Sequence, residues 1–179
     1  MRKLFLGILA LSLLAGPTLA ANILGNPGFE TGSLPPWYQK ADLGGPENWN
    51  VTTADKHSGT YSATDVGNKL IAQDFAAVPV SDILLASFWL KNVDASINAV
   101  YFQYSDLTTE ENIWWPTGGW DYVDATGWLD AGKSLISFGV YGVLGGSTQR
   151  TYVDDWTLDV IPEPTTLALL TVAALFRRR

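Results

Sequence analysis

The chain has 179 residues, of which 47% are hydrophobic and 16% charged, and its formal net charge is −7. It contains no cysteine, which excludes disulfide bonds, thiol catalysis and zinc–thiolate sites. Between the two terminal segments considered below, residues 21–160 hold six basic and seventeen acidic residues, a net charge of about −11. Such a surface disfavours nucleic acid and anionic membranes as partners, and it favours cations, calcium among them.

The first twenty residues have the three parts of a secretory signal peptide. Arg2 and Lys3 form a basic region, Leu4 to Leu14 form an apolar one, and the stretch 18–20 supplies small residues before a cut. We therefore expect residues 1–20 to form a signal helix that is removed after Ala20 on export.

Residues 21–160 predict a single all-β domain. Short runs of β-branched and aromatic residues are separated by Gly, Pro, Asn and Asp about every ten residues, and no long 3.6-residue stripe occurs. This spacing predicts a β-sandwich or jelly roll. The expected strands are Trp49–Thr53, Tyr61–Thr64, Lys69–Phe75, Ile83–Lys91, Ala99–Ser105, Gly119–Tyr122, Leu135–Val143 and Thr151–Val160.

The C-terminal segment, residues 161–179, has the form of a processing signal. Pro162-Glu163-Pro164 is followed by an apolar run to Phe176 and then by Arg177, Arg178 and Arg179. As a helix the run would be about 18 Å long, short for a hydrocarbon core of about 30 Å. The alternative is a buried C-terminal helix with a basic end.

This tail resembles the PEP-CTERM sorting signal of exopolysaccharide-producing Gram-negative bacteria. The resemblance implies a short hydrophobic helix that associates transiently with the inner membrane, with the arginines in the cytoplasm. It also implies cleavage near Pro162–Pro164 by an exosortase-type enzyme. We therefore expect export through the inner membrane to the cell surface or extracellular matrix.

Three segments between the signals resemble a second known pattern. They are Asn22–Gly32 with its Gly28-Phe29-Glu30, His57–Ser62 with its Ser-Gly pair, and Tyr152–Leu158 with its paired aspartates. In this order they look like the galactose-binding-like jelly roll of bacterial carbohydrate-binding modules, and Ile83–Lys91 resembles the hydrophobic central strand of that family. The resemblance implies a non-catalytic module that binds extracellular polysaccharide.

In several such modules the two chain ends meet at a structural calcium ion, which takes six to eight oxygen ligands. By position, Glu30 and Asp154 would give carboxylates, and Gly28 and a carbonyl near Lys56–Ser58 would give backbone oxygens. Asp55 is a further candidate. The alternative is that Glu30 caps a turn and that the aspartates are solvated charges at a strand edge.

Eight tryptophans and seven tyrosines are many for this length, and aromatic faces stack on sugar rings. Trp114 and Trp115 cannot both point inward in an extended segment. We expect a glycan-binding cleft, with packing in the core or rim as the alternative role for each of its residues. The residues expected to line it are Tyr101, Gln103, Trp115, Trp120 and Tyr122, whereas Trp37, Trp89 and Trp156 are assigned to packing.

An enzyme is the least favoured reading. His57 is the only histidine and lies in a Ser-Gly turn, and no nucleophile elbow or phosphate-binding loop is present. A glycosidase or lyase would need a pair of opposed carboxylates, which the many acids leave open. The rival of carbohydrate binding is a purely structural cell-envelope protein without a glycan site.

Overall fold

The structure is a computed structural model that describes residues 20–93, 96–144 and 148–162. The expected signal helix and the expected sorting helix with its arginines therefore lie outside the described residues. The described part is an all-β sandwich of two antiparallel sheets, which confirms the predicted fold class.

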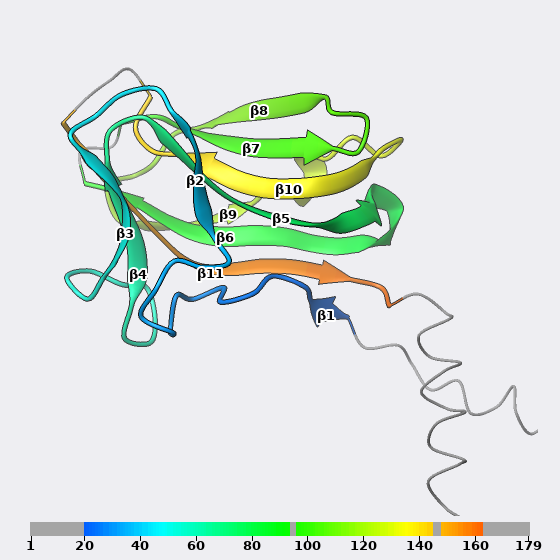
Figure 1. The fold of residues 1–179 in the computed structure, drawn as a ribbon, viewed down its shortest axis with the longest axis horizontal. Helices are drawn as coiled ribbons and strands as arrows, with labels where there is room; N and C mark the ends of the chain where they lie inside the picture. Colours follow the sequence, from blue (N-terminus) through cyan, green and yellow to red (C-terminus); the bar gives the residue numbers. More distant parts are fainter. Residues whose placement is uncertain (1–19, 94–95, 145–147, 163–179) are drawn as a thin grey trace, which may run out of the picture.

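Sheet A has the strand order β3-β4-β11-β6-β9, with β1 paired to β11, and sheet B has the order β2-β5-β10-β7-β8. Figure 1 shows the two layers, with β7, β10 and β5 above β6 and β11. Two short 3₁₀ turns, Val80–Asp82 and Thr126–Trp128, complete the described elements. The strands of sheet A are β1 (Ala21–Asn22), β3 (Glu47–Thr52), β4 (Ser62–Val66), β6 (Ile83–Asn92), β9 (Trp120–Asp124) and β11 (Arg150–Val160). Those of sheet B are β2 (Tyr38–Asp42), β5 (Lys69–Pro79), β7 (Asn98–Tyr104), β8 (Thr109–Trp114) and β10 (Ser134–Tyr141).

The core lies between the sheets and centres on aromatic side chains from both. The Trp156 ring of sheet A stacks on Phe88 at 4.1 Å and meets Phe138 of sheet B edge-on at 5.0 Å. Trp37, which precedes β2, packs against Trp156 at 4.6 Å. Trp37 and Trp156 are buried as predicted, whereas Trp89 is half-buried outside this core. Large rings that bury this much apolar surface compensate for the absence of disulfides.

Side chains alternate along each strand, so each sheet also has an outer face. In sheet B, Ile71, Phe102 and Val140 point into the core, and their neighbours point away from it. A second apolar cluster on this outer side is separate from the main core. Its members are Leu70, Ala72, Ala99, Tyr101 and Tyr141.

All eight expected strands are present, with ends shifted by a few residues. The sequence prediction missed β1, β2 and β8. β2 reads Tyr-Gln-Lys-Ala-Asp and β8 reads Thr-Glu-Glu-Asn-Ile-Trp, so neither has the apolar character of a central strand. Both lie at the edges of sheet B, where charged side chains are common because they discourage edge-to-edge pairing.

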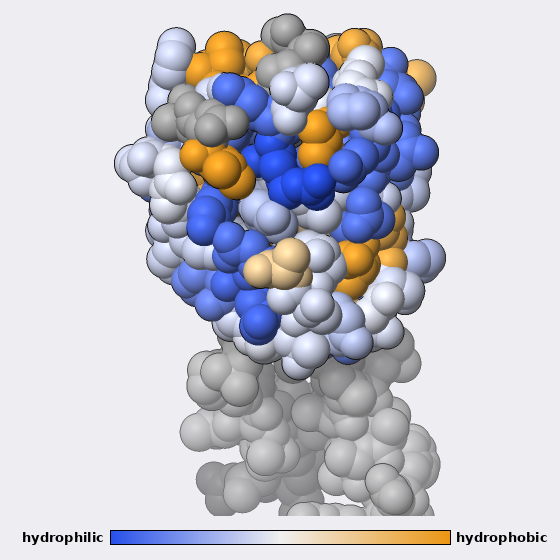
Figure 2. Space-filling model, turned by 90° about the vertical axis from the view of Figure 1, so that its left-hand side faces the viewer, coloured by the Kyte–Doolittle hydropathy of each residue, from blue (hydrophilic) through white to orange (hydrophobic). Residues whose placement is uncertain are grey.

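The two ends of the described chain lie at one end of the sandwich. Ala21 of β1 pairs with Val160 of β11, the last residue of that strand (Figure 1). Figure 2 looks onto the opposite end, where hydrophilic residues gather in the middle and hydrophobic ones lie around them. Arg150 and Glu47 form an ion pair of 2.8 Å. Within the described ranges, no helix is long and apolar enough to span a membrane.

Candidate functional site

The outer face of sheet B carries a group of polar and aromatic side chains, here named the sheet B face. Two small residues lie in the middle of this face, where Gly139 of β10 pairs with Ala72 of β5 on one side and with Tyr101 of β7 on the other. Larger side chains surround this middle. The residues of the sheet B face are Tyr38, Lys40, Asp74, Tyr101, Gln103, Glu111, Ser137 and Tyr141.

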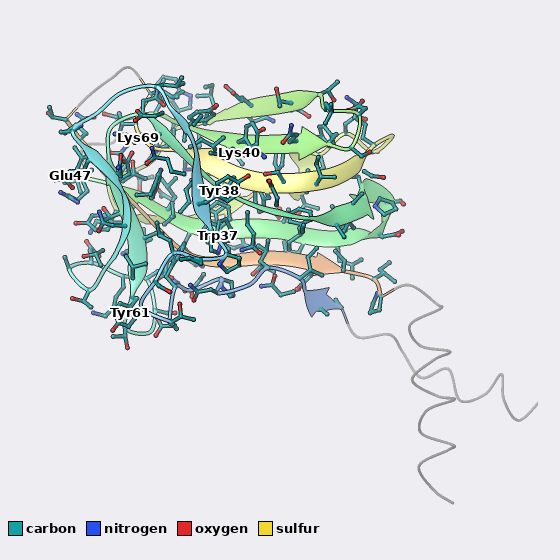
Figure 3. All side chains as sticks on the ribbon, viewed as in Figure 1. Trp37, Tyr38, Lys40, Glu47, Tyr61 and Lys69 are labelled. Carbon is teal, nitrogen blue, oxygen red and sulfur yellow. The ribbon has the colours of Figure 1, made fainter. Side chains whose placement is uncertain are left out.

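Lys40 reaches over this face because β2 has a bulge at its position. In the backbone register, Gln39 pairs with Ile71 and Ala41 with Leu70. Lys40 lies between them and has no Cα partner on β5. Its ammonium group donates hydrogen bonds to Asp74 Oδ1 at 2.7 Å, Gln103 Oε1 at 2.7 Å and Ser137 Oγ at 3.1 Å. Figure 3 shows Tyr38 and Lys40 along β2. The Lys40 ammonium group thus links its own strand, β2, to β5, β7 and β10.

Asp74 is the anionic partner within this group. Its Oδ2 accepts a hydrogen bond from the Tyr38 hydroxyl at 2.5 Å. Burial alone would raise the pKa of Asp74, but the hydrogen bonds from Lys40, Ser137 and Tyr38 outweigh burial and lower this pKa below its usual value. Burial and the bond to Asp74 raise the pKa of Tyr38. At neutral pH the face therefore combines an ionised Asp74 with a protonated Tyr38.

Tyr101 and Tyr141 form the aromatic floor of the face. Their rings meet edge-on at 6.2 Å, and the Lys40 ammonium lies 5.6 Å from the centre of the Tyr101 ring. Burial and the nearby Glu111 carboxylate raise the pKa of Tyr141 to about 12. Tyr101 is only 5% exposed, whereas Tyr38 is 39% exposed. Tyr38 is therefore the ring of this face that an incoming ligand can reach.

The predicted cleft is wrong as a single site, because the structure divides its residues between the two sheets. Tyr101 and Gln103 lie on β7 of sheet B, whereas Trp120 and Tyr122 lie on β9 of sheet A. Trp115 follows β8 directly and is 72% exposed, while the preceding Trp114 packs inward against Trp128. The opposite orientations of the two tryptophans agree with the prediction. The connection between β8 and β9 crosses from one sheet to the other, which periodicity alone does not reveal.

A second polar group, here named the loop clamp, lies on the sheet A side. It comprises residues 28–30, the loop 53–61 between β3 and β4, and residues 154–155 of β11. Glu30 Oε1 accepts hydrogen bonds from the backbone N–H groups of Thr60 and Tyr61, both at 3.0 Å. Asp154 Oδ2 accepts those of His57 at 3.0 Å and Ser58 at 3.2 Å. The two carboxylates predicted as calcium ligands thus hold the same loop.

Gly28 also lies where the prediction placed it. A Cβ atom at residue 28 would be 3.3 Å from Asp155 Oδ1 and 3.6 Å from Asp154 Oδ1. Burial raises the pKa of Asp154 to about 6, against the effect of the N–H groups that it binds. Gly28, Glu30 and Asp154 are therefore brought together. Within the described residues, however, no three His, Asp or Glu side chains form a metal-binding group.

Asp55 and Lys56 lie elsewhere in the same loop. The Asp55 carboxylate pairs with Lys91 Nζ at 2.7 Å and accepts a hydrogen bond from Trp120 Nε1 at 3.1 Å. Burial raises the pKa of Asp55, but these bonds, with the N–H of Lys56, lower it overall. The carboxylate of Asp55 is therefore bound to sheet A and is not joined to those of Glu30 and Asp154.

His57 completes the contact between the loop and sheet A. Its ring stacks on Trp89 with centroids 3.7 Å apart, and its Nδ1 lies 2.7 Å from Asp155 Oδ2. Tyr122 packs beside Trp89 at 5.4 Å and is 45% exposed. Most aromatic rings on the sheet A side are thus in contact with other parts of the same chain.

The sequence prediction missed six residues of the sheet B face: Tyr38, Lys40, Asp74, Glu111, Ser137 and Tyr141. Asp74 and Tyr141 could have been found from strand alternation, because residues two apart in a strand share a face. Asp74 lies two residues from Ala72, and Tyr141 lies two residues from Gly139, each pair in an expected strand. Lys40 could not, because its orientation depends on the bulge in an edge strand.

Comparison with known proteins gives neighbours in structure alone. No protein-family model and no curated protein sequence matches the chain. Three solved structures cover most of it. These neighbours are carbohydrate-binding modules. At identities of 11–21% their likeness to this chain establishes the shared β-sandwich fold.

The first neighbour is TmCBM61, solved in complex with β-1,4-galactotriose, which has 21% identity and a TM-score of 0.54 and covers 77% of this chain and 97% of its own. The second is the family 11 carbohydrate-binding module from Clostridium thermocellum, solved with a β-1,3-1,4-mixed-linked tetrasaccharide. It has 11% identity and a TM-score of 0.53, over 79% and 96% of the two chains. The third is the xylan-binding domain from CBM 22, with 12% identity and a TM-score of 0.51, over 83% and 96%.

Proposed function

We propose that this protein is a non-catalytic carbohydrate-binding module that binds extracellular polysaccharide through the sheet B face. The observation that carries the proposal is an outer sheet face with a half-exposed tyrosine, a nearly buried aromatic floor and a hydrogen-bonded group of Lys40, Asp74, Gln103 and Ser137. Sugar hydroxyls need both donors and acceptors, and sugar rings need apolar contact area; this face supplies both. The fold shared with carbohydrate-binding modules supports the same conclusion.

The sheet A side is a poorer candidate for the glycan site. The loop 53–61 already contacts the carboxylates of Glu30 and Asp154 and the rings of Trp89 and Trp120. On the sheet B face, by contrast, the side chain of Asp74 is 53% exposed, and that of Tyr38 is accessible. A ligand there would add contacts without first displacing a segment of the chain.

Affinity electrophoresis of the purified protein in gels that contain soluble β-glucans, galactan or xylan tests the proposal. We expect at least one polysaccharide to retard the protein, and Trp115→Ala to weaken the retardation less than Tyr38→Ala does. No retardation by any polymer would leave the structural cell-envelope protein as the better description. Release of reducing sugar from a retarding polymer would contradict the non-catalytic role.

We also propose that the protein reaches the cell surface or extracellular matrix by means of its two terminal signals. The described domain supports this by keeping its sheet hydrogen bonds between Ala21 and Val160. The last backbone hydrogen bond beyond β11 joins the N–H of Ile161 to Asp82 O at 2.8 Å. Cleavage near Pro162–Pro164 by an exosortase-type enzyme would therefore leave every strand intact. Mass spectrometry of the native protein should find no peptide that contains Arg179.

A structural calcium ion at the loop clamp is the remaining part of the proposal. The residues fit in kind, because Glu30 and Asp154 supply carboxylate oxygens, and Asp154 is buried with the Asp155 carboxylate next to it. The ion would neutralise this group of carboxylates and tie β11 to the N-terminal segment. Calcium should raise the melting temperature relative to chelator, and Glu30→Ala should abolish the rise.

A further inference from the structure

The positive charges of this domain are almost all neutralised within the molecule. Of the six lysines and arginines between residues 21 and 160, five form an ion pair with a carboxylate. Lys56, in the loop 53–61 on the sheet A side, forms no ion pair with the residues that the structure describes. A polyanion that approaches the domain therefore meets an excess of carboxylates and few available cations.

On the sheet B face, Lys40 is the only cationic side chain among the described residues that takes part. Its side chain is 19% exposed, and its three hydrogen bonds go to Asp74, Gln103 and Ser137. A lysine ammonium has three donors, so these bonds use all of them. Glu111, on the neighbouring β8, adds a further negative charge that Tyr141 contacts. The face as a whole is thus neutral to slightly negative.

We propose that the sheet B face selects uncharged polysaccharides over acidic ones, and that Asp74 is the residue that determines this selectivity. This inference rests on the proposed carbohydrate binding. Asp74 pairs with the one ammonium group that could receive a uronate carboxylate, and its own charge repels that carboxylate. Lys40 then acts as a fixed bridge between strands and its charge is not offered to the ligand. Without Asp74, Lys40 would keep Gln103 and Ser137 as neutral partners, and its charge would be available.

The test compares two forms of the same polymer. A β-glucan or galactan that retards the wild-type protein is oxidised at its C6 hydroxymethyl groups to carboxylates, so that linkage and length stay the same and only charge changes. Affinity for both forms is measured with the full-length protein and with Asp74→Asn. The control is Asp124→Asn, which removes one exposed carboxylate from β9 of sheet A and contacts nothing on the sheet B face.

We expect the wild-type protein to bind the oxidised polymer at least about tenfold more weakly, and the neutral polymer with an affinity that changes by less than about twofold between low and high salt. Asp74→Asn should reduce the neutral-to-acidic affinity ratio severalfold, and added salt should restore it; Asp124→Asn should leave the ratio unchanged. Equal wild-type affinity for both forms would overturn the selectivity while carbohydrate binding stands. An unchanged ratio in a folded Asp74→Asn variant would overturn the role of Asp74. Absence of binding to either form would overturn both proposals.

Discussion

The loop clamp and the sheet B face contain the same kinds of residues but use them differently. In the loop clamp, the Asp154 and Glu30 carboxylates each bind two backbone N–H groups of one loop, and the His57 ring stacks on Trp89. On the sheet B face, the polar groups join side chains of neighbouring strands, and Tyr38 stays half-exposed. Residue type alone therefore does not separate a structural site from a binding site. What separates them is exposure: Asp154 is buried, whereas the side chains of Tyr38 and Asp74 remain accessible to a ligand.

The largest expected effect comes from removing the centre of the loop clamp. Asp154→Ala leaves the N–H groups of His57, Ser58 and Asp155 without their acceptor, and hydrogen bonds to a charged group contribute about 1.5–3 kcal/mol each. Burial of the charged carboxylate, which raises the pKa of Asp154 to about 6, offsets part of the sum of the three bonds, so we expect the free energy of unfolding to fall by about 3 kcal/mol in urea denaturation. Asp124→Ala, which removes an exposed acceptor of a single N–H, is the control and should cost less than about 1 kcal/mol. Equal losses in both variants would mean that the clamp adds no stability of its own.

The next largest effect depends on pH and concerns Asp65 of β4, outside both sites. Burial raises its pKa to about 6, although Lys69 and the N–H of Val66 favour the charged form. Because this pKa is higher in the folded than in the unfolded chain, the carboxyl group stabilises the fold fully only below about pH 4, and the stabilisation is lost as the pH rises through about 6. Asp65→Asn should therefore be about 2 kcal/mol more stable than wild type at pH 8 and nearly equal to it at pH 4. A difference that is the same at both pH values would contradict the assignment.

A smaller effect is expected at His57. His57→Ala removes the stack on Trp89 and the contact with Asp155, and should lower the free energy of unfolding by about 1 kcal/mol. His57→Phe keeps a ring for the stack and should recover about half of the loss. Thermal melts of the three proteins would measure both effects. If His57→Phe is no better than His57→Ala, the stacking contact does not stabilise the loop.

The sequence was sufficient for the fold class because short runs of β-branched and aromatic residues, separated by Gly, Pro, Asn and Asp, predict most of the strands. The sequence also predicted that Gly28, Glu30 and Asp154 lie near one another, and they do, although 126 positions separate Gly28 from Asp154. The proposed glycan site was harder to predict. Trp120 and Tyr122 are close in sequence to Trp115, yet the chain passes from sheet B to sheet A between them. The orientation of the Lys40 side chain depends on a bulge in a polar edge strand, and the periodicity of the sequence does not reveal a bulge.

The most direct test of the account compares Tyr38 and Tyr122, which are similarly exposed tyrosines on the two opposite sheets, at 39% and 45%. Affinity for a bound polysaccharide is measured by isothermal titration for wild type, Tyr38→Ala and Tyr122→Ala, with melting temperatures to confirm that all three are folded. We expect Tyr38→Ala to weaken binding by about tenfold or more, because an aromatic contact and its hydrogen bond are lost. We expect Tyr122→Ala to change the affinity by less than about twofold. Loss of binding in Tyr122→Ala with an unchanged Tyr38→Ala would place the glycan site on sheet A and contradict the central claim.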